Sequence, residues 1–202
     1  MFFTFDGVNL IETCHSREIS DMIAIMSEII VDQLISRALL RRSLNAGEFL
    51  FHQGDEVQSL FIVASGLVEL IRHQPDGASI VLQRAAERTI LAEASVYSQS
   101  YHCDAIAQAP AKIFELSRTS FLKHLRQDEY LAHQWAAHLA REVQSARYRS
   151  EIMTLYTVAE RLDAWLVWQD NALPPKGERK SVATQIGVSP EALYRELAKR
   201  DL

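Results

Sequence analysis

Two side chains near the end of the printed chain, Glu191 and Arg195, are of types that read DNA bases, and they lie four residues apart. A glutamate can accept a hydrogen bond from cytosine N4, and an arginine can bind guanine through two hydrogen bonds. Both would reach base edges from the first turns of a helix that enters the major groove. The candidate DNA-binding residues, including two expected at phosphates, are Ser189, Pro190, Glu191, Ala192, Tyr194, Arg195, Lys199 and Arg200.

The segment KSVATQIGVSPEALYRELAKRDL (residues 180–202) predicts the helix that would position them. Ser189 is a good N-cap and Pro190 suits the first helical position. Gly187 can adopt the left-handed conformation that ends the preceding helix, and Ala183 is small enough for a close helix crossing. This pattern predicts a helix-turn-helix, although the same geometry also occurs as plain packing in helical proteins. The expected inward residues are Val182, Ala183, Ile186, Leu193 and Leu197.

Two pairs of adjacent metal-ligand types, Cys14–His15 and His102–Cys103, raise the possibility of a metal or haem site. They could meet if the N-terminal arm folded over the rest of the domain. A structural role for Cys103 is favoured over a metal site. A cysteine in a strand behaves as a small buried hydrophobe, and adjacent strand residues such as His102 and Cys103 point to opposite faces. We therefore expect no metal site. His124, His133 and His138 fall on helical segments and are expected to be solvated.

The stretch LNAGEFLFHQGDEVQSLFIVASGLVEL (residues 44–70) predicts short strands separated by glycines. Such strands at regular spacing are typical of a sandwich or barrel that can enclose a small pocket. HQPDGAS (residues 73–79) has the composition of a hairpin turn. The expected strands are residues 48–51, 59–64, 67–72, 79–83, 103–107 and 112–116.

Helical periodicity occupies both flanks of the strands. Residues 19–40 predict one or two amphipathic helices, and residues 157–169 predict another before a loop at 170–179. Between the last strand and residue 157, a long helix would carry a stripe of small or apolar residues. We favour a dimer seam for this stripe over packing on the chain's own sheet domain. We expect three parts, at 1–126, 127–155 and 156–202. The stripe comprises Trp135, Leu139, Val143, Ala146, Ser150 and Met153.

Composition narrows the class of protein. The net charge is −5 over 202 residues, which argues against a protein coated with basic charge but allows a local DNA-reading surface. No apolar run approaches the roughly 20 residues that a membrane span needs, and the N-terminus is a poor signal peptide. The two cysteines suit a reduced, cytoplasmic protein. With no nucleophile–base pair, phosphate loop or metal tetrad in the sequence, we expect no enzyme activity.

Together these segments resemble the CRP/FNR family of bacterial transcription regulators. AGEFLFHQGDEVQSLFIVASGLVELIRHQPDGASIVLQ is similar to the family's cyclic-nucleotide-binding β-roll, TVAERLDAWL to the first helix of its DNA-binding domain, and IGVSPEALYREL to its helix-turn-helix. The resemblance implies an α+β fold in which an antiparallel jelly-roll β-roll precedes a long dimerisation helix and a helix-turn-helix domain. The family continues into a β-hairpin wing, most of which we expect to be missing here.

The resemblance also implies where an effector would bind. The matching phosphate cassette is LAEASVYSQSYHCDAIA (residues 91–107), in which Glu93 is kept. Cys103 replaces the family's phosphate-binding arginine and Asp104 replaces its serine, so we expect that cyclic AMP does not bind, because a cyclic phosphate needs a cation or a nest of donors. The candidate pocket residues are Glu93, Ala94, Cys103, Asp104 and Arg147.

Other effectors remain open at this stage. Two cysteines are too few for the four-cysteine iron–sulfur cluster of oxygen-sensing members. The cassette sequence is similar to that of the family branch that regulates dissimilatory nitrate respiration. That branch is associated with haem and nitric oxide sensing, so haem stays a possibility. The favoured function is a dimeric regulator of double-stranded DNA that responds to a small-molecule or redox signal. The alternative is an effector-binding or dimerisation protein that has lost DNA binding, because most of the wing is expected to be missing and polar Glu196 and Arg200 stand where apolar residues are usual.

Overall fold

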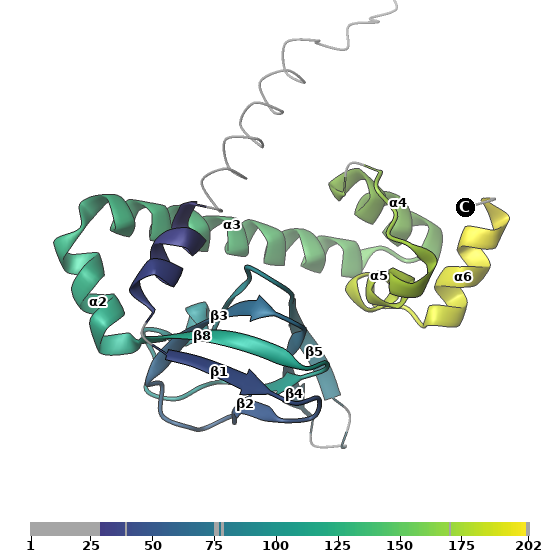
Figure 1. The fold of residues 1–202 in the computed structure, drawn as a ribbon. Helices are drawn as coiled ribbons and strands as arrows, with labels where there is room; N and C mark the ends of the chain where they lie inside the picture. The colour runs from purple at the N-terminus through teal and green to yellow at the C-terminus, as the bar shows by residue number, and fades with distance from the viewer. Residues whose placement is uncertain (1–28, 39, 75–76, 78, 170, 201–202) are drawn as a thin grey trace, which may run out of the picture. The chain divides into compact units, whose positions relative to one another are not determined.

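The structure is a computed structural model that describes residues 29–38, 40–74, 77, 79–169 and 171–200. Cys14 and His15 lie outside these residues, as do Pro75 and Asp76 of the predicted turn. The chain divides into two compact units, residues 1–138 and 139–202, and the division falls inside one long helix. The helices and strands carry the labels of Figure 1.

The first unit contains two four-stranded antiparallel sheets (Figure 1). One has the order β1-β8-β3-β6 and the other the order β2-β7-β4-β5. This confirms the predicted antiparallel roll. Its strands are β1 (Leu40–Leu44), β2 (Phe49–Phe51), β3 (Ser59–Ser65), β4 (Val68–His73), β5 (Ser79–Ala85), β6 (Ile90–Leu91), β7 (Asp104–Ala107) and β8 (Ala111–Ser117).

Two of these strands were not predicted. Residues 29–37 are helical, but Leu40, placed at the end of a helical stretch by its periodicity, begins β1 instead. β1 pairs along its whole length with β8, from Leu40 opposite Glu115 to Leu44 opposite Ala111. β6 has two residues and pairs with β3. Both strands are specified by partners distant in sequence, which a local pattern does not reveal.

The roll's core lies among apolar side chains of both sheets. It includes Phe51, Phe61, Val63, Leu70, Leu91, Cys103, Ala105 and Ile113. Gly66 connects β3 to β4 with a φ of +90°, and a Cβ there would collide with Pro110 O and Ala111. A glycine is required at this corner because its backbone conformation is left-handed and its neighbour is main chain.

Helices complete the first unit: α2 (Arg118–Gln127) follows β8 directly, and α3 (Glu129–Thr154) begins two residues later. The Phe121 ring packs edge-on against Trp135, with centroids 4.8 Å apart. Trp135 is only 3% exposed, so in the single chain it belongs to the unit's own core. His138 is 8% exposed and contacts the Trp135 ring, so the expectation that it is solvated was wrong.

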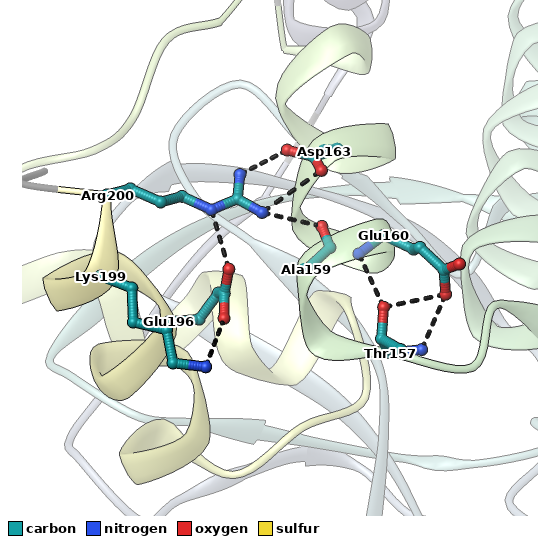
Figure 2. Close-up of polar contacts among 7 residues, drawn as sticks. All are labelled: Thr157, Ala159, Glu160, Asp163, Glu196, Lys199 and Arg200. Carbon is teal, nitrogen blue, oxygen red and sulfur yellow. Dashed lines mark hydrogen bonds and ion pairs between the residues drawn. The ribbon is translucent and has the colours of Figure 1, made fainter.

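The second unit is helical. After the end of α3 it contains α4 (Val158–Trp168), a short 3₁₀ helix η2 (Lys176–Glu178), α5 (Arg179–Gln185) and α6 (Pro190–Lys199). α4 begins with a capping box, in which Thr157 accepts from Glu160 N and the Glu160 carboxylate accepts from Thr157 N (Figure 2). Within the residues that the structure describes, no helix is both long enough and apolar enough to cross a bilayer. The unit's core contains Ile152, Leu162, Trp165, Val182, Ala183, Ile186, Leu193 and Leu197.

Candidate functional site

The last two helices, α5 and α6, form the predicted bihelical corner. Val188 N donates to Ala183 O at 2.9 Å and Gly187 N donates to Thr184 O at 3.2 Å, which is the hydrogen-bond pattern of a Schellman motif. Gly187 has a φ of +65°, as this motif requires. Ser189 then caps α6 by accepting from Ala192 N at 3.2 Å. The five residues expected to face inward are all at most 1% exposed.

The opposite face of α6 is open to solvent at Glu191, Tyr194 and Arg195. Hydrogen bonds from its own backbone N–H, and then from Ser189, lower the pKa of Glu191, so this carboxylate is ionised at neutral pH. Tyr194 donates its hydroxyl hydrogen to Lys176 O at 3.0 Å and thereby fixes η2 beside α6. The structure therefore places the candidate base-reading residues together on one exposed surface at the start of a capped helix.

The two candidate phosphate contacts have different surroundings. Lys199 is exposed, and its ammonium lies 3.3 Å from one Glu196 oxygen. Arg200, by contrast, is only 22% exposed in its side chain and is bound by Asp163, Glu196 and the carbonyl of Ala159 (Figure 2). The sequence identified both as cations but gave no information about Asp163, which lies on α4.

Sequence reasoning missed Arg161, which joins three parts of the second unit. Its guanidinium donates to the carbonyls of Met153 and Leu155 at the end of α3, at 3.1 and 2.8 Å. It also donates to Ile186 O and Gly187 O in the helix-turn-helix turn, both at 3.1 Å. Since all four acceptors are main-chain carbonyls, no residue type in the sequence signals this role.

The stripe on α3 divides into two kinds of residue. In the second unit, Val143 and Met153 are 49% and 43% exposed, and Ala146 and Ser150 are also exposed, while Leu139 is half-buried. The neighbouring face of the helix is covered, because Ile152 is in the core and the Tyr148 hydroxyl donates to Ala164 O. An uncovered small and apolar stripe therefore runs along this part of α3.

The candidate effector residues lie mainly at the β6–β7 connection of the first unit. Glu93 and Ala94 belong to the 3₁₀ helix η1 (Glu93–Ser95), which follows Ala92 in the left-handed conformation with φ +67°. Cys103 is 1% exposed, and burial raises the pKa of its thiol to about 11. Its side chain is part of the roll's core, as predicted, and at neutral pH the buried group is an uncharged thiol. Arg147 lies on α3 in the second unit and is exposed.

Asp104 is only 8% exposed, and its carboxylate contacts neighbouring residues. Gln53 N donates to one carboxylate oxygen at 2.8 Å, and the nearest ring nitrogens of His52 and His73 lie 3.4 and 3.6 Å from the carboxylate. Across residues 29–38, 40–74, 77, 79–169 and 171–200, no group of three or more His, Cys, Asp or Glu side chains could hold a metal ion.

A cation does lie beside this connection, although not at the position of Cys103. Arg72 on β4 donates Nε and Nη2 to His102 O at 3.3 and 3.1 Å. Burial and then the positive charge of Arg72 lower the pKa of His102, whose Nδ1 lies 2.9 Å from Ser95 Oγ. The sequence comparison of cassette residues missed Arg72, because it comes from a strand some 30 residues earlier.

Known proteins are similar to this chain in the region of the roll. Residues 41–128 match the family model of the cyclic nucleotide-binding domain. The cyclic AMP receptor protein of Thermus thermophilus is 28% identical over 123 residues, which are 60% of this chain and 57% of that protein. The alignment thus spans little more than half of that relative's length.

Solved structures extend the likeness beyond the roll. A Ruegeria pomeroyi protein described as cyclic nucleotide-binding is 25% identical, with a TM-score of 0.58 over 86% of this chain and 80% of its own. A CRP-family transcriptional regulator of Thermus thermophilus, 18% identical, has a TM-score of 0.57 over 79% of this chain and 84% of its own, and shows the fold alone. Residues 41–128 therefore match the cyclic nucleotide-binding domain, and the chain is similar to a cyclic AMP receptor protein and has the fold of CRP-family transcription regulators.

Proposed function

We propose that this protein is a DNA-binding transcription regulator whose helix α6 enters the major groove. The observation that carries the proposal is the exposed face of a capped α6, with Glu191, Tyr194 and Arg195 outward while Leu193 and Leu197 are at most 1% exposed. Its N-terminal residues are those that a recognition helix presents to base edges. Lys176, Lys180 and Lys199 are exposed cations around this face and supply candidate phosphate contacts. Of the proteins compared above, one is named a cyclic AMP receptor protein and another a CRP-family transcriptional regulator.

The regulator acts as a homodimer through α3. Val143, Ala146, Ser150 and Met153 recur at spacings of three and four residues and are uncovered in the single chain. Packed against its own copy, this stripe would form a coiled-coil seam, in which small residues allow close approach. Trp135 is the exception, since it is already buried. Two copies of α6 would then read two half-sites about 34 Å apart on a palindromic operator.

The signal acts at the roll, and it is not cyclic AMP. The cassette position that holds the family's phosphate-binding arginine carries Cys103, whose thiol is buried and uncharged. Arg72 lies near but donates two hydrogen bonds to a carbonyl. An effector can shift the protein only by binding one arrangement more tightly than another. Isothermal titration of the purified protein with cyclic AMP should show no saturable binding, and a micromolar dissociation constant would refute this step.

The alternative, a protein of this fold that no longer binds DNA, rested in part on Glu196 and Arg200. In the structure these two side chains bind each other, with Arg200 Nε 2.9 Å from Glu196 Oε1. Since Leu193 and Leu197 still fill the core beneath them, the two polar residues do not disrupt the corner. No observation on α6 therefore favours the loss of DNA binding over its retention.

The deciding experiment selects genomic fragments with the full chain at defined salt and then measures the best duplex by mobility shift. We expect Arg195→Ala to weaken that duplex about 5- to 150-fold, because one bidentate base contact is worth about 1–3 kcal/mol. Its matched control is Arg126→Ala, an exposed arginine on α2 in the first unit. A wild-type protein without sequence preference at any salt concentration, with or without candidate effectors, would refute the proposed function.

A further inference from the structure

The side chain of Arg200, just after α6, makes more directional contacts than a free surface cation. Nε donates to Glu196 Oε1 at 2.9 Å, and Nη2 donates to Asp163 Oδ2 at 3.3 Å and to Ala159 O at 3.2 Å. Nη1 donates to the other oxygen of Asp163. Figure 2 shows the guanidinium between α6 and α4, with Glu196 on one side and Asp163 and Ala159 on the other. All three guanidinium nitrogens are therefore engaged.

The contacts of Arg200 join two helices, α4 and α6, that are far apart in the sequence. Glu196 lies in α6, one turn before Arg200, while Asp163 and Ala159 lie on α4, some 40 residues earlier. Arginine suits this geometry, because its planar fork binds a carboxylate bidentately and holds a fixed orientation. The Glu196 and Arg200 side chains are 13% and 22% exposed, whereas the Asp163 side chain is 62% exposed.

We propose that Arg200 is a positioning residue that fixes the recognition helix α6 on α4, and does not contact DNA phosphates. The proposal rests on the DNA-binding function proposed above. A phosphate would have to replace Asp163 or Glu196 on the guanidinium, and both carboxylates would repel it at that distance. Glu196, Arg200 and Asp163 thus form one charged contact between the end of α6 and α4.

Lys199 provides the matched cation for a test. It precedes Arg200 directly, but its side chain is 68% exposed and makes one contact, with Glu196 at 3.3 Å. Replacing either residue by glutamine removes one positive charge from the end of α6. If charge toward DNA were all that mattered, Lys199→Gln and Arg200→Gln would behave alike. If Arg200 positions the helix, only its replacement should loosen α6.

The first readout needs no DNA, so it stands even if the proposed function fails. Hydrogen exchange of the full chain is measured on peptides that cover α4 and α6. We expect Arg200→Gln to speed exchange in the last turn of α6 at least threefold and Lys199→Gln to leave it unchanged. Asp163→Asn should produce part of the same effect and should add less in the Arg200→Gln background than it does alone, because the two side chains act as one unit. Equal exchange in Arg200→Gln and wild type would overturn the proposal.

The second readout is the salt dependence of binding to the selected duplex. Loss of a phosphate contact reduces the slope of log K against log salt by about 0.9. We expect Arg200→Gln to weaken binding at least threefold with an unchanged slope. A slope reduced by about one for Arg200→Gln, with normal exchange in α6, would assign Arg200 to a phosphate instead and refute the positioning role.

Discussion

Replacing Arg161 by alanine tests how the second unit is held together. The guanidinium binds four main-chain carbonyls, two at the end of α3 and two in the turn between α5 and α6. Hydrogen bonds to charged groups contribute about 1.5–3 kcal/mol each. Two of the four are partly buried and two are exposed, and an exposed carbonyl regains a bond to water. The partly buried pair alone therefore predicts a loss of about 3 kcal/mol in the free energy of unfolding.

The full chain is unfolded by heat and by urea, and unfolding is monitored through the signal of the helical second unit. For a unit of this size, about 3 kcal/mol corresponds to a fall of roughly 10 °C or more in the unfolding midpoint. Arg161→Lys should recover only part of the loss, because one ammonium cannot reach four carbonyls. The matched control is Arg147→Ala, an exposed arginine on α3 in the same unit. If Arg161→Ala came within about 0.5 kcal/mol of that control, the reasoning from these contacts would be refuted.

Three further changes test other parts of the structure. Gly187→Ala should destabilise the second unit by about 1–2 kcal/mol in urea unfolding, because a φ of +65° disfavours a Cβ, whereas Gly177→Ala, with open space around it, should be near neutral. Val143→Asp should raise the dimer dissociation constant in analytical ultracentrifugation at least tenfold through repeated like charge across the seam, while exposed Gln144→Asp should not. Hydrogen bonds, first from Arg200, lower the pKa of Glu196 below its ordinary 4.5, so its stabilisation is present above pH 4.5 and lost as the pH falls further. Acid unfolding of wild type should therefore be steeper than that of Glu196→Gln, and identical curves would contradict this.

Local signals in the sequence predicted the helix-turn-helix well. Ser189 as an N-cap and Gly187 as a left-handed terminator act within one or two turns of their own position, so neighbouring residues specify them. The inward spacing of Leu193 and Leu197 follows from helical periodicity in the same way. Most strands of the roll were also predicted, because glycines and turn residues separate them.

The missed features all depend on partners far away in sequence. β1 carries the exposed Arg42, whose Nε donates to Glu115 Oε2 on β8 at 2.8 Å, and Glu115 also accepts from the buried Ser59. Trp135 shares a period with the exposed stripe of α3, and periodicity alone does not show that Phe121 covers it. Arg161 and Arg200 read as ordinary helix-surface cations until α4 is placed beside α5 and α6. The roles of these side chains come from tertiary contacts, which one sequence does not display.

The two arginines give α4 a central part in the second unit. Arg161 lies in the first turns of α4. It binds both the carbonyls at the end of α3 and the turn of the helix-turn-helix. Arg200 binds Asp163 and Ala159 on the same helix from the far end of α6. Both ends of the corner are therefore fixed to α4, and α4 is fixed to the end of α3. Since these contacts are many and directional, we expect α6, α4 and the end of α3 to move together as one assembly.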